Sequence, residues 1–337
     1  MKVTDFQGPE NPPGEEKADP KGRGAETPLV IVTGPTASGK SGLALALAEQ
    51  AAGTVINADS MQVYRDLRVL TARPDATEEA RVPHRLFGVL GAEERCSVGR
   101  WLDMAVAEVA AARDAGRLPI VVGGTGMYLK ALTQGLAPVP EVADDVTASS
   151  TALYDEIGGE AFRDRLAVLD AEAARSLPPG DRQRLIRAHA VATATGRALA
   201  DWQADHPAEP PVRGPVVWIL IQPPRADLYA ACDGRFGAML EAGALDEVRD
   251  LLARDLDPGL PAMRAVGVPE LRAYLQGEMD LDQAADKARQ ATRNYAKRQY
   301  TWFRHQMTPD LVLDRGGAGM LDEILEKGTI PGLVRIR

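Results

Sequence analysis

The stretch "IVTGPTASGKSGLALALAE", residues 31–49, decides the fold. It places the pattern G-x-x-x-x-G-K-S between an apolar run and a segment rich in alanine and leucine, the strand–loop–helix context of a phosphate-binding loop. Gly34 and Gly39 let the loop turn its N–H groups inward, and these donors and the helix N-terminus favour a polyanion. Lys40 adds a positive charge, and the Ser41 hydroxyl can reach a Mg²⁺ ion bound to the phosphates. Most chains with this pattern bind ATP or GTP.

Four short apolar runs predict buried parallel strands, at residues 28–34, 54–59, 119–124 and 215–223. Helix-like segments follow the first three, so we expect an α/β fold whose core is a P-loop-type parallel sheet flanked by helices. Ligands of such sheets bind at the carboxyl ends of the strands, so the segments after the strands should converge on one crevice. These segments are Gly34–Ser41, Asp59, Gly123–Gly126 and Gln222–Arg225.

The rest of the chain predicts an all-helical domain inserted into this core. Residues 141–212 carry no strand signal; in them Asp181 can cap a helix and Gly196 can end it. The N-terminal residues, rich in proline, glycine and charge, should be a disordered tail. The expected division is 1–27 tail, 28–140 first part of the core, 141–212 insertion, 213–317 last strand and C-terminal helices, and 318–337 C-terminal segment.

Composition limits the kind of protein. The net charge of −9 argues against nucleic-acid binding by the whole surface and leaves room for a local basic groove. Cys96 and Cys232 lie too far apart in sequence for a disulfide framework or a thiolate metal site, which fits a cytoplasmic setting. No apolar run is long enough to span a membrane. We expect a monomer.

Polar residues at the strand ends are the candidates for chemistry. Asp59 can act as a general base or bind Mg²⁺, or it can cap a helix. At the third strand end, where phosphate-hydrolysing P-loop enzymes usually carry an acid, the chain has glycines and Thr125, which disfavours a GTPase or a motor ATPase. Arg225 follows the fourth strand and can contact the same phosphates, or it can be a surface arginine.

A helix near the C-terminus favours a polyanionic partner. Residues 287–309 contain no acid, and at helical spacing one narrow face gathers Arg289, Arg293, Lys297, Tyr300 and Arg304. The alternative is a solvated charged face, but such faces usually mix both signs. In the insertion, Gln183, Arg184 and Arg187 crowd one side of a helix. Two basic surfaces beside one crevice suggest a nucleic acid bound through its phosphates, which salt should weaken.

The order of the motifs resembles the tRNA isopentenyltransferase family. It is carried by "GPTASGKS", "INADSMQVYR", "TARP", "VGGTGMYLKAL", "DRQRLIRA", "TGRALADWQ" and "ATRNYAKRQYTWFR", from residue 28 to about 305. The resemblance implies transfer of a dimethylallyl group from dimethylallyl diphosphate to N6 of the adenine beside the anticodon of tRNA, position 37, with release of diphosphate. The partners it implies are the anticodon stem-loop and dimethylallyl diphosphate, with Mg²⁺ as cofactor.

The resemblance also implies roles for residues. Asp59 would be the base, Thr125 would orient the amine, and Arg225 and Lys40 would stabilise the leaving diphosphate, with Mg²⁺ on Ser41. The diphosphate would be held by Gly34, Pro35, Thr36, Ala37, Ser38, Gly39, Lys40 and Ser41. The tRNA would contact Asp59, Ser60, Met61, Gln62, Gln183, Arg184, Leu185, Ile186 and Arg187. The chain departs from the family at Val268 and Pro269, where the family has tyrosine and a basic residue, which affects one tRNA contact.

Three alternatives remain at the level of sequence. The first is an isopentenyltransferase that acts on free AMP, ADP or ATP, which would need neither the insertion nor two basic surfaces. The second is a P-loop kinase, which would bind ATP and release ADP. The third is an inactive RNA-binding protein, which the joint presence of Lys40, Ser41, Asp59 and Thr125 disfavours.

Overall fold

A parallel sheet forms the centre of the computed structural model, which describes residues 27–205, 208–328 and 330. Among these residues the sheet has six strands in the order β3-β2-β4-β1-β5-β6. They are β1 Leu29–Thr33, β2 Thr54–Asn57, β3 His84–Arg85, β4 Pro119–Gly123, β5 Val216–Ile221 and β6 Leu311–Leu313. The four predicted strands and the α/β class are confirmed. The edge strands β3 and β6 were not predicted, because two or three residues are too short to form an apolar run.

Strand β1, which leads into the P-loop, lies between β4 and β5 and is fully buried. Its side chains alternate between two cores, as the pleat of a strand requires. Leu29 and Ile31 pack on one face of the sheet, and Val30 and Val32 pack on the other. The P-loop is therefore anchored at the most buried position of the sheet.

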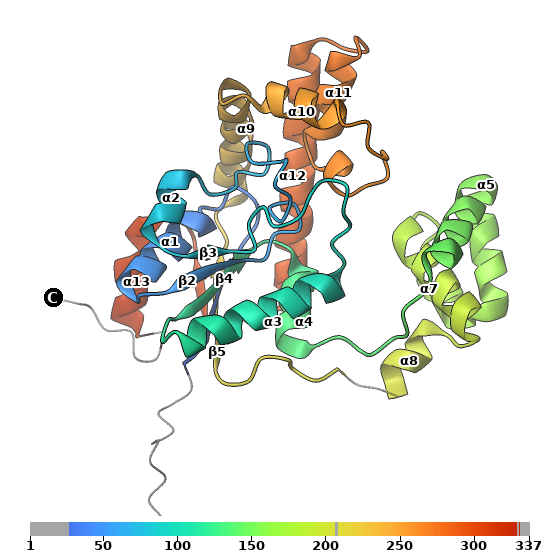
Figure 1. The fold of residues 1–337 in the computed structure, drawn as a ribbon, viewed down its shortest axis with the longest axis horizontal. Helices are drawn as coiled ribbons and strands as arrows, with labels where there is room; N and C mark the ends of the chain where they lie inside the picture. The colour runs from blue at the N-terminus through green and yellow to red at the C-terminus, as the bar shows by residue number, and fades with distance from the viewer. Residues whose placement is uncertain (1–26, 206–207, 329, 331–337) are drawn as a thin grey trace, which may run out of the picture.

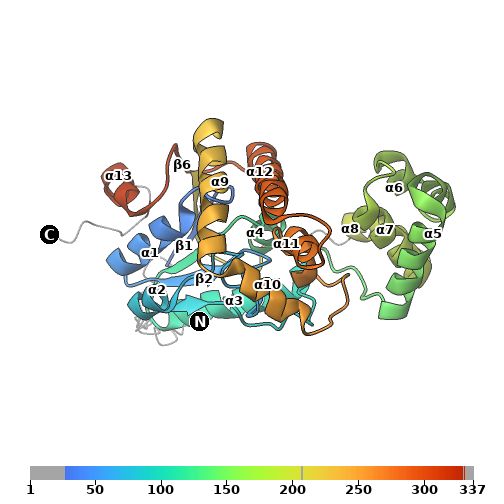
Figure 2. The same ribbon diagram turned by 90° about the horizontal axis from the view of Figure 1, so that it is seen from above.

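Helices cover both faces of this sheet (Figure 1). Those of the core are α1 Lys40–Gln50, α2 Ala76–Arg81, α3 Val98–Asp114, α4 Gly126–Gln134, α9 Arg225–Glu241, α10 Ala244–Leu252, α11 Val268–Leu275, α12 Leu281–Gln306 and α13 Leu321–Lys327, with short 3-10 turns η1 Ala262–Arg264 and η2 Ala318–Met320. Helix α1 packs on the Val30 face together with α13, whereas α3 and α4 pack on the Ile31 face. Figure 2 shows α9 and α12 side by side.

The predicted insertion contains four helices that stand apart from the sheet (Figure 1). They are α5 Asp144–Leu169, α6 Ala171–Ser176, α7 Arg182–Thr195 and α8 Leu199–Asp205. The first three enclose a small core of their own, with Phe162 and Leu185 fully buried. Residues 1–26 of the predicted tail, and 329 and 331–337 of the C-terminal segment, lie outside the described residues. None of the described helices is long and apolar enough to cross a membrane.

Candidate active site

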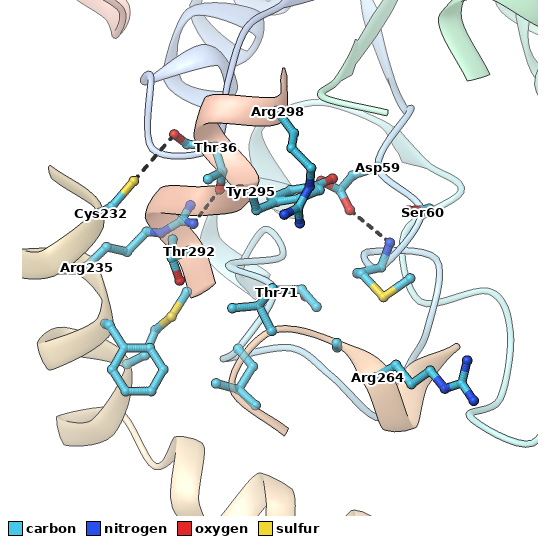
Figure 3. A pocket seen from close by; sticks show the side chains of 16 residues that line it. Thr36, Asp59, Ser60, Thr71, Cys232, Arg235, Arg264, Thr292, Tyr295 and Arg298 are labelled. Carbon is cyan, nitrogen blue, oxygen red and sulfur yellow. Dashed lines mark hydrogen bonds between the residues drawn. The ribbon is translucent and has the colours of Figure 1, made fainter. Parts of the chain in front are cut away.

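A cavity of about 260 Å³ opens beside the P-loop, between the strand ends and helices α9 and α12 (Figure 3). Polar side chains of Thr36, Asp59, Arg235, Tyr295 and Arg298 face it. Its apolar lining consists of Met61, Leu70, Cys232, Phe236, Met239, Ala265 and Val266. The cavity therefore offers charged and apolar surfaces to one ligand. Thr36 and Asp59 come from different strand ends, so these two segments converge as predicted.

The P-loop has the backbone that its glycines permit. Gly39 lies at φ +84°, a left-handed conformation that favours glycine, and Gly34 has no room for a Cβ because it would overlap the Ile221 carbonyl oxygen. Lys40 lies at the start of α1, with Nζ donating to the Pro35 carbonyl oxygen at 3.4 Å. Burial lowers the pKa of Lys40 to about 8; the Asp59 carboxylate opposes this effect and the Arg235 charge adds to it.

Helices α9 and α12 hold the P-loop from the cavity side. The Thr36 N–H donates to Gln299 Oε1 at 2.7 Å, and Gln299 Nε2 donates to the Gly124 carbonyl oxygen at 2.8 Å. The Arg235 guanidinium donates to Thr36 Oγ1. Gln299 therefore joins the first and third predicted strand ends, while Arg235 brings a second cation within reach of the loop and Lys40.

A second arginine, Arg235, lies beside the loop in addition to the predicted Arg225. Arg225 is exposed at the start of α9, with its guanidinium 5.8 Å from the centre of the Tyr300 ring, and it does not line the cavity. Sequence reasoning missed Arg235 because it follows the strand by several helical turns. One signal was present: on α9 the buried positions Cys232, Phe236 and Met239 form a stripe that Arg235 adjoins. A cation beside an apolar stripe is costly to bury without a purpose.

Asp59 both caps a turn and faces the cavity. Asp59 Oδ1 accepts hydrogen bonds from the backbone N–H groups of Met61, at 2.8 Å, and Gln62, at 3.4 Å. The capping alternative and a chemical role are therefore compatible. Thr125 Oγ1 accepts from the Ser60 N–H at 2.9 Å and is also hydrogen-bonded to Tyr295, whose pKa burial raises. The segments carrying Asp59 and Thr125 are thus fixed against each other and against α12.

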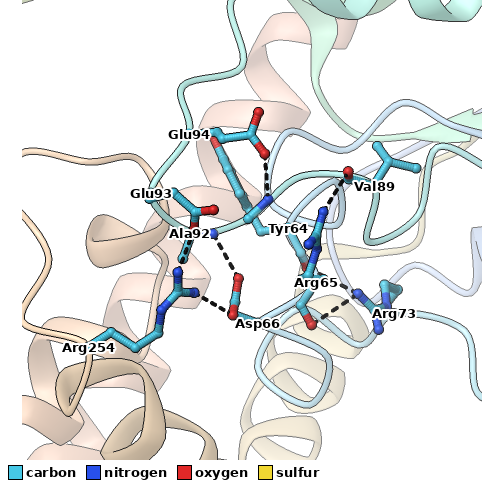
Figure 4. Close-up of polar contacts among 10 residues, drawn as sticks. Tyr64, Arg65, Asp66, Arg73, Val89, Ala92, Glu93, Glu94 and Arg254 are labelled. Carbon is cyan, nitrogen blue, oxygen red and sulfur yellow. Dashed lines mark hydrogen bonds and ion pairs between the residues drawn. The ribbon is translucent and has the colours of Figure 1, made fainter.

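The segment after Asp59 is held by Glu247 of α10 and by Arg254, which follows that helix. Figure 4 shows Arg254 with its two acidic partners, Asp66 and Glu93. Three consecutive N–H groups, of Arg68, Val69 and Leu70, donate to the Glu247 carboxylate, with the last two at 2.7 and 2.9 Å. Arg254 pairs with Asp66 at 2.6 Å and with Glu93 at 2.5 Å. Because Leu70 lines the cavity, these contacts fix one of its walls.

We expect Glu247→Gln to destabilise the fold by about 1–3 kcal/mol, since the amide offers one weaker oxygen to three backbone donors. The exposed Glu241 on the neighbouring α9 supplies the matched control, Glu241→Gln, which should be close to neutral. Urea unfolding of both variants measures the difference. Equal stability of the two variants would show that the three hydrogen bonds contribute little.

The residues predicted to contact tRNA fall into two groups. Ser60 and Met61 line the cavity with Asp59, whereas the Gln62 amide donates to the Thr71 and Ala72 carbonyl oxygens and so braces the loop. On α7 the side chains of Gln183, Arg184 and Arg187 are exposed. Leu185 and Ile186 are buried in the core of the insertion, which corrects their assignment as contact side chains.

The cationic stripe of α12 is partly neutralised. Arg289 pairs with Asp286 at 2.8 Å, and Arg293 pairs with Asp233 of α9. Lys297 and Arg304 are exposed. Only part of the predicted stripe therefore offers charge to a partner.

Ser41, the predicted Mg²⁺ ligand, is exposed at the first turn of α1. The described residues hold no group of three His, Cys, Asp or Glu side chains placed to bind a metal ion. An ion there would depend on phosphate oxygens of the substrate for most of its ligands, which is how Mg²⁺ is commonly bound.

The chain matches known protein families over most of its length. The model of the IPP transferase family matches residues 62–306, and the isopentenyl transferase model matches residues 27–88. A tRNA dimethylallyltransferase of Rhodospirillum centenum is 56% identical over 292 residues, which is 87% of this chain and 93% of the relative. One of Rhodospirillum rubrum is 55% identical over 305 residues, 90% of this chain and 94% of the relative.

Solved structures share the fold. The tRNA isopentenylpyrophosphate transferase of Bacillus halodurans is 31% identical, with a TM-score of 0.64 over 90% of this chain and 97% of that one. A eukaryotic dimethylallyltransferase solved acting on tRNA has a TM-score of 0.76 at 22% identity, over 92% of this chain and 81% of that one. The family match over most of the chain, together with relatives more than half identical over nearly their whole length, shows that this chain belongs to the IPP transferase family of tRNA dimethylallyltransferases.

Proposed function

We propose that this chain transfers a dimethylallyl group from dimethylallyl diphosphate to N6 of adenine 37 in tRNA, releasing diphosphate. The observation that carries the proposal is the cavity, which is lined by Thr36 of the P-loop, the Asp59 carboxylate and an apolar wall. A dimethylallyl diphosphate has a matching charged end and apolar end. The named relatives, more than half identical to this chain, are tRNA dimethylallyltransferases.

Asp59 acts as the base in this proposal. An adenine amino group is a weak nucleophile, because its lone pair is delocalised into the ring. As the nitrogen forms its bond to the allylic carbon, the carboxylate accepts the N6 proton. Thr125, fixed by Ser60 and Tyr295, orients the same amine. The adenine must first leave the anticodon-loop stack, at a cost of a few kcal/mol.

The loop and its cations stabilise the leaving group. As the carbon–oxygen bond breaks, negative charge develops on the diphosphate. This charge is stabilised by the N–H groups of the loop and by the cations Lys40 and Arg235. Arg235 is added here to Arg225, the arginine that the sequence suggested for this role. Ser41 Oγ would contribute a ligand to Mg²⁺, which supplies further positive charge to the diphosphate when bound.

The test of this proposal is a product analysis. Unmodified tRNA transcript, dimethylallyl diphosphate and Mg²⁺ are incubated with the protein, and the tRNA is digested to nucleosides for mass spectrometry. We expect N6-dimethylallyladenosine, confined to position 37 by mapping of nuclease fragments. Modification at another adenine, or none while dimethylallyl diphosphate is consumed, would contradict the proposal.

Transfer should depend on pH through Lys40. Its charged form attracts the diphosphate, and burial lowers the pKa of Lys40 to about 8, so the charge is present at lower pH and is lost as pH rises past 8. We therefore expect kcat/KM for dimethylallyl diphosphate, at saturating tRNA, to fall on the alkaline side. An arginine keeps its charge there, so the alkaline limb should disappear in Lys40→Arg, whatever the absolute rate. If kcat/KM of Lys40→Arg fell at the same alkaline pH as that of the wild type, another group would be responsible for the fall.

Reversal of charge on α7 should weaken tRNA binding alone. Arg187 is the cleaner choice, since Arg184 already pairs with Asp181 at 3.3 Å. We expect Arg187→Glu to weaken binding and to reduce its dependence on salt, with an unchanged KM for dimethylallyl diphosphate. Arg165→Glu, an exposed position on α5, controls for the net charge. Equal losses of tRNA affinity in both variants would indicate that the net charge of the insertion, and not a contact at Arg187, attracts the tRNA.

A further inference from the structure

The segment that follows β6 crosses the P-loop. We call residues 314–320 the C-terminal strap. The Gly317 N–H donates to the Gly39 carbonyl oxygen at 3.0 Å. The strap reaches this place because β6 ends beside β5, where the Gln222 N–H donates to the Leu313 carbonyl oxygen at 2.7 Å. Two segments from opposite ends of the chain thus meet, backbone to backbone, at the P-loop.

The closeness of this contact depends on glycine. A Cβ on Gly316 would overlap the Ser38 carbonyl oxygen and lie 2.8 Å from the Cα of Gly39. A Cβ on Gly39 would in turn lie 3.0 Å from the carbonyl carbon of Gly316 and the nitrogen of Gly317. These neighbours are backbone atoms, which cannot swing aside as the end of a side chain does. Any side chain at 316 must therefore move either the strap or the loop.

The strap is anchored at both ends, so it is not free to yield. Before it, β6 pairs with β5 in parallel register. At its end, Met320, and beyond it Ile324, are buried in the same core as Leu43 and Leu47 of α1. Figures 1 and 2 show α13 beside α1. A displacement at Gly316 would therefore be passed on to Ser38 and Gly39.

Those two loop residues directly precede Lys40. The direction of the N–H groups of Gly39 and Lys40 depends on the peptide planes whose carbonyls the strap contacts. Ser38 is itself buried, and its Oγ has no hydrogen-bond partner within the described part of the chain. The loop thus takes its conformation from the strap and from the fold around it, and not from a hydrogen bond of the Ser38 hydroxyl.

We propose that Gly316 and Gly317 are positioning residues, which set the backbone of the P-loop for the diphosphate without touching it. The inference rests on the proposed role of the loop in holding the diphosphate of dimethylallyl diphosphate. It gives the C-terminal segment, which lies beyond the residues matched by either family model, a part in substrate binding.

The test compares Gly316→Ala with Gly319→Ala. Gly319 lies in the same strap, and an added Cβ there meets nothing within 4 Å. For both variants we would measure the Kd of inorganic diphosphate with Mg²⁺ by calorimetry, the KM for dimethylallyl diphosphate, the Kd of tRNA and the Tm. Gly316→Ala should raise the Kd of diphosphate and the KM for dimethylallyl diphosphate by about tenfold or more, and it should leave the tRNA Kd unchanged. Gly319→Ala should match the wild type in all of these quantities.

Two results would overturn the inference. The first is a folded Gly316→Ala variant whose diphosphate Kd and whose KM for dimethylallyl diphosphate equal those of the wild type. The second is an equal loss of diphosphate and tRNA binding together with a lower Tm, because a merely structural role predicts that combination. If Gly316→Ala does not fold, Met320→Ala loosens the anchor without a clash, and a wild-type diphosphate Kd in that variant would overturn the inference. Failure of the wild type to bind diphosphate or dimethylallyl diphosphate would overturn the proposed function instead, and the inference with it.

Discussion

An Asp59→Asn variant is expected to bind tRNA with unchanged affinity and to lose transfer by roughly 10²–10⁴-fold in kcat. The amide keeps an oxygen where Oδ1 accepts the Met61 and Gln62 N–H groups, so the turn keeps its cap. It removes only the ability to take a proton. Single-turnover transfer with labelled dimethylallyl diphosphate measures the chemical step, and filter binding measures the tRNA affinity.

Asp59→Ala separates the two roles of this residue further. It removes the cap as well as the base, so it should lower the Tm below that of Asp59→Asn while transfer stays equally low. Wild-type turnover in Asp59→Asn would contradict the assignment of the base and leave Asp59 a capping residue.

Arg235→Gln is expected to lower kcat by about 10²–10³-fold, the loss typical for one group that stabilises developing negative charge. Its guanidinium donates to Thr36 Oγ1 in the loop and lies close enough to Lys40 to affect the pKa of that residue. The matched control is Arg225→Gln on the same helix, which removes an exposed arginine that does not line the cavity. The single-turnover transfer assay with saturating dimethylallyl diphosphate and tRNA measures the rate of each variant.

The pair of arginine variants distinguishes the sequence-based assignment from the structural one. A large loss in Arg225→Gln with little change in Arg235→Gln would return the role to Arg225. A rise in KM for dimethylallyl diphosphate without a fall in kcat, in Arg235→Gln, would mean that Arg235 binds substrate and transition state equally.

Local sequence patterns predicted the parts of the fold that local physics controls. The long apolar runs became the four central strands, and the glycine-rich loop led into α1. On α7 the Asp181 side chain accepts from the Arg184 N–H, and Gly196 ends the helix at φ +68°, both as expected. Because parallel strands share one carboxyl edge, the convergence of Thr36 and Asp59 also followed from sequence.

Contacts between distant segments could not be predicted in this way. Gln299, Glu247 and the strap glycines act on loops far from them in sequence, and their positions depend on how α10, α12 and β6 pack. Helical spacing showed which residues of α12 share a face but not that Arg293 pairs with Asp233. The place of Arg235 beside Thr36 likewise depends on how α9 lies over the loop.

A transfer assay supplies labelled dimethylallyl diphosphate and Mg²⁺ with either unmodified tRNA or AMP as acceptor. The proposed function predicts label on tRNA and none on AMP, because the insertion and its exposed arginines serve a polynucleotide. Label on AMP would contradict the proposed function and place this chain among the enzymes that prenylate free nucleotides. Label on neither, with ATP consumed in its place, would contradict the identity of the diphosphate that the loop holds.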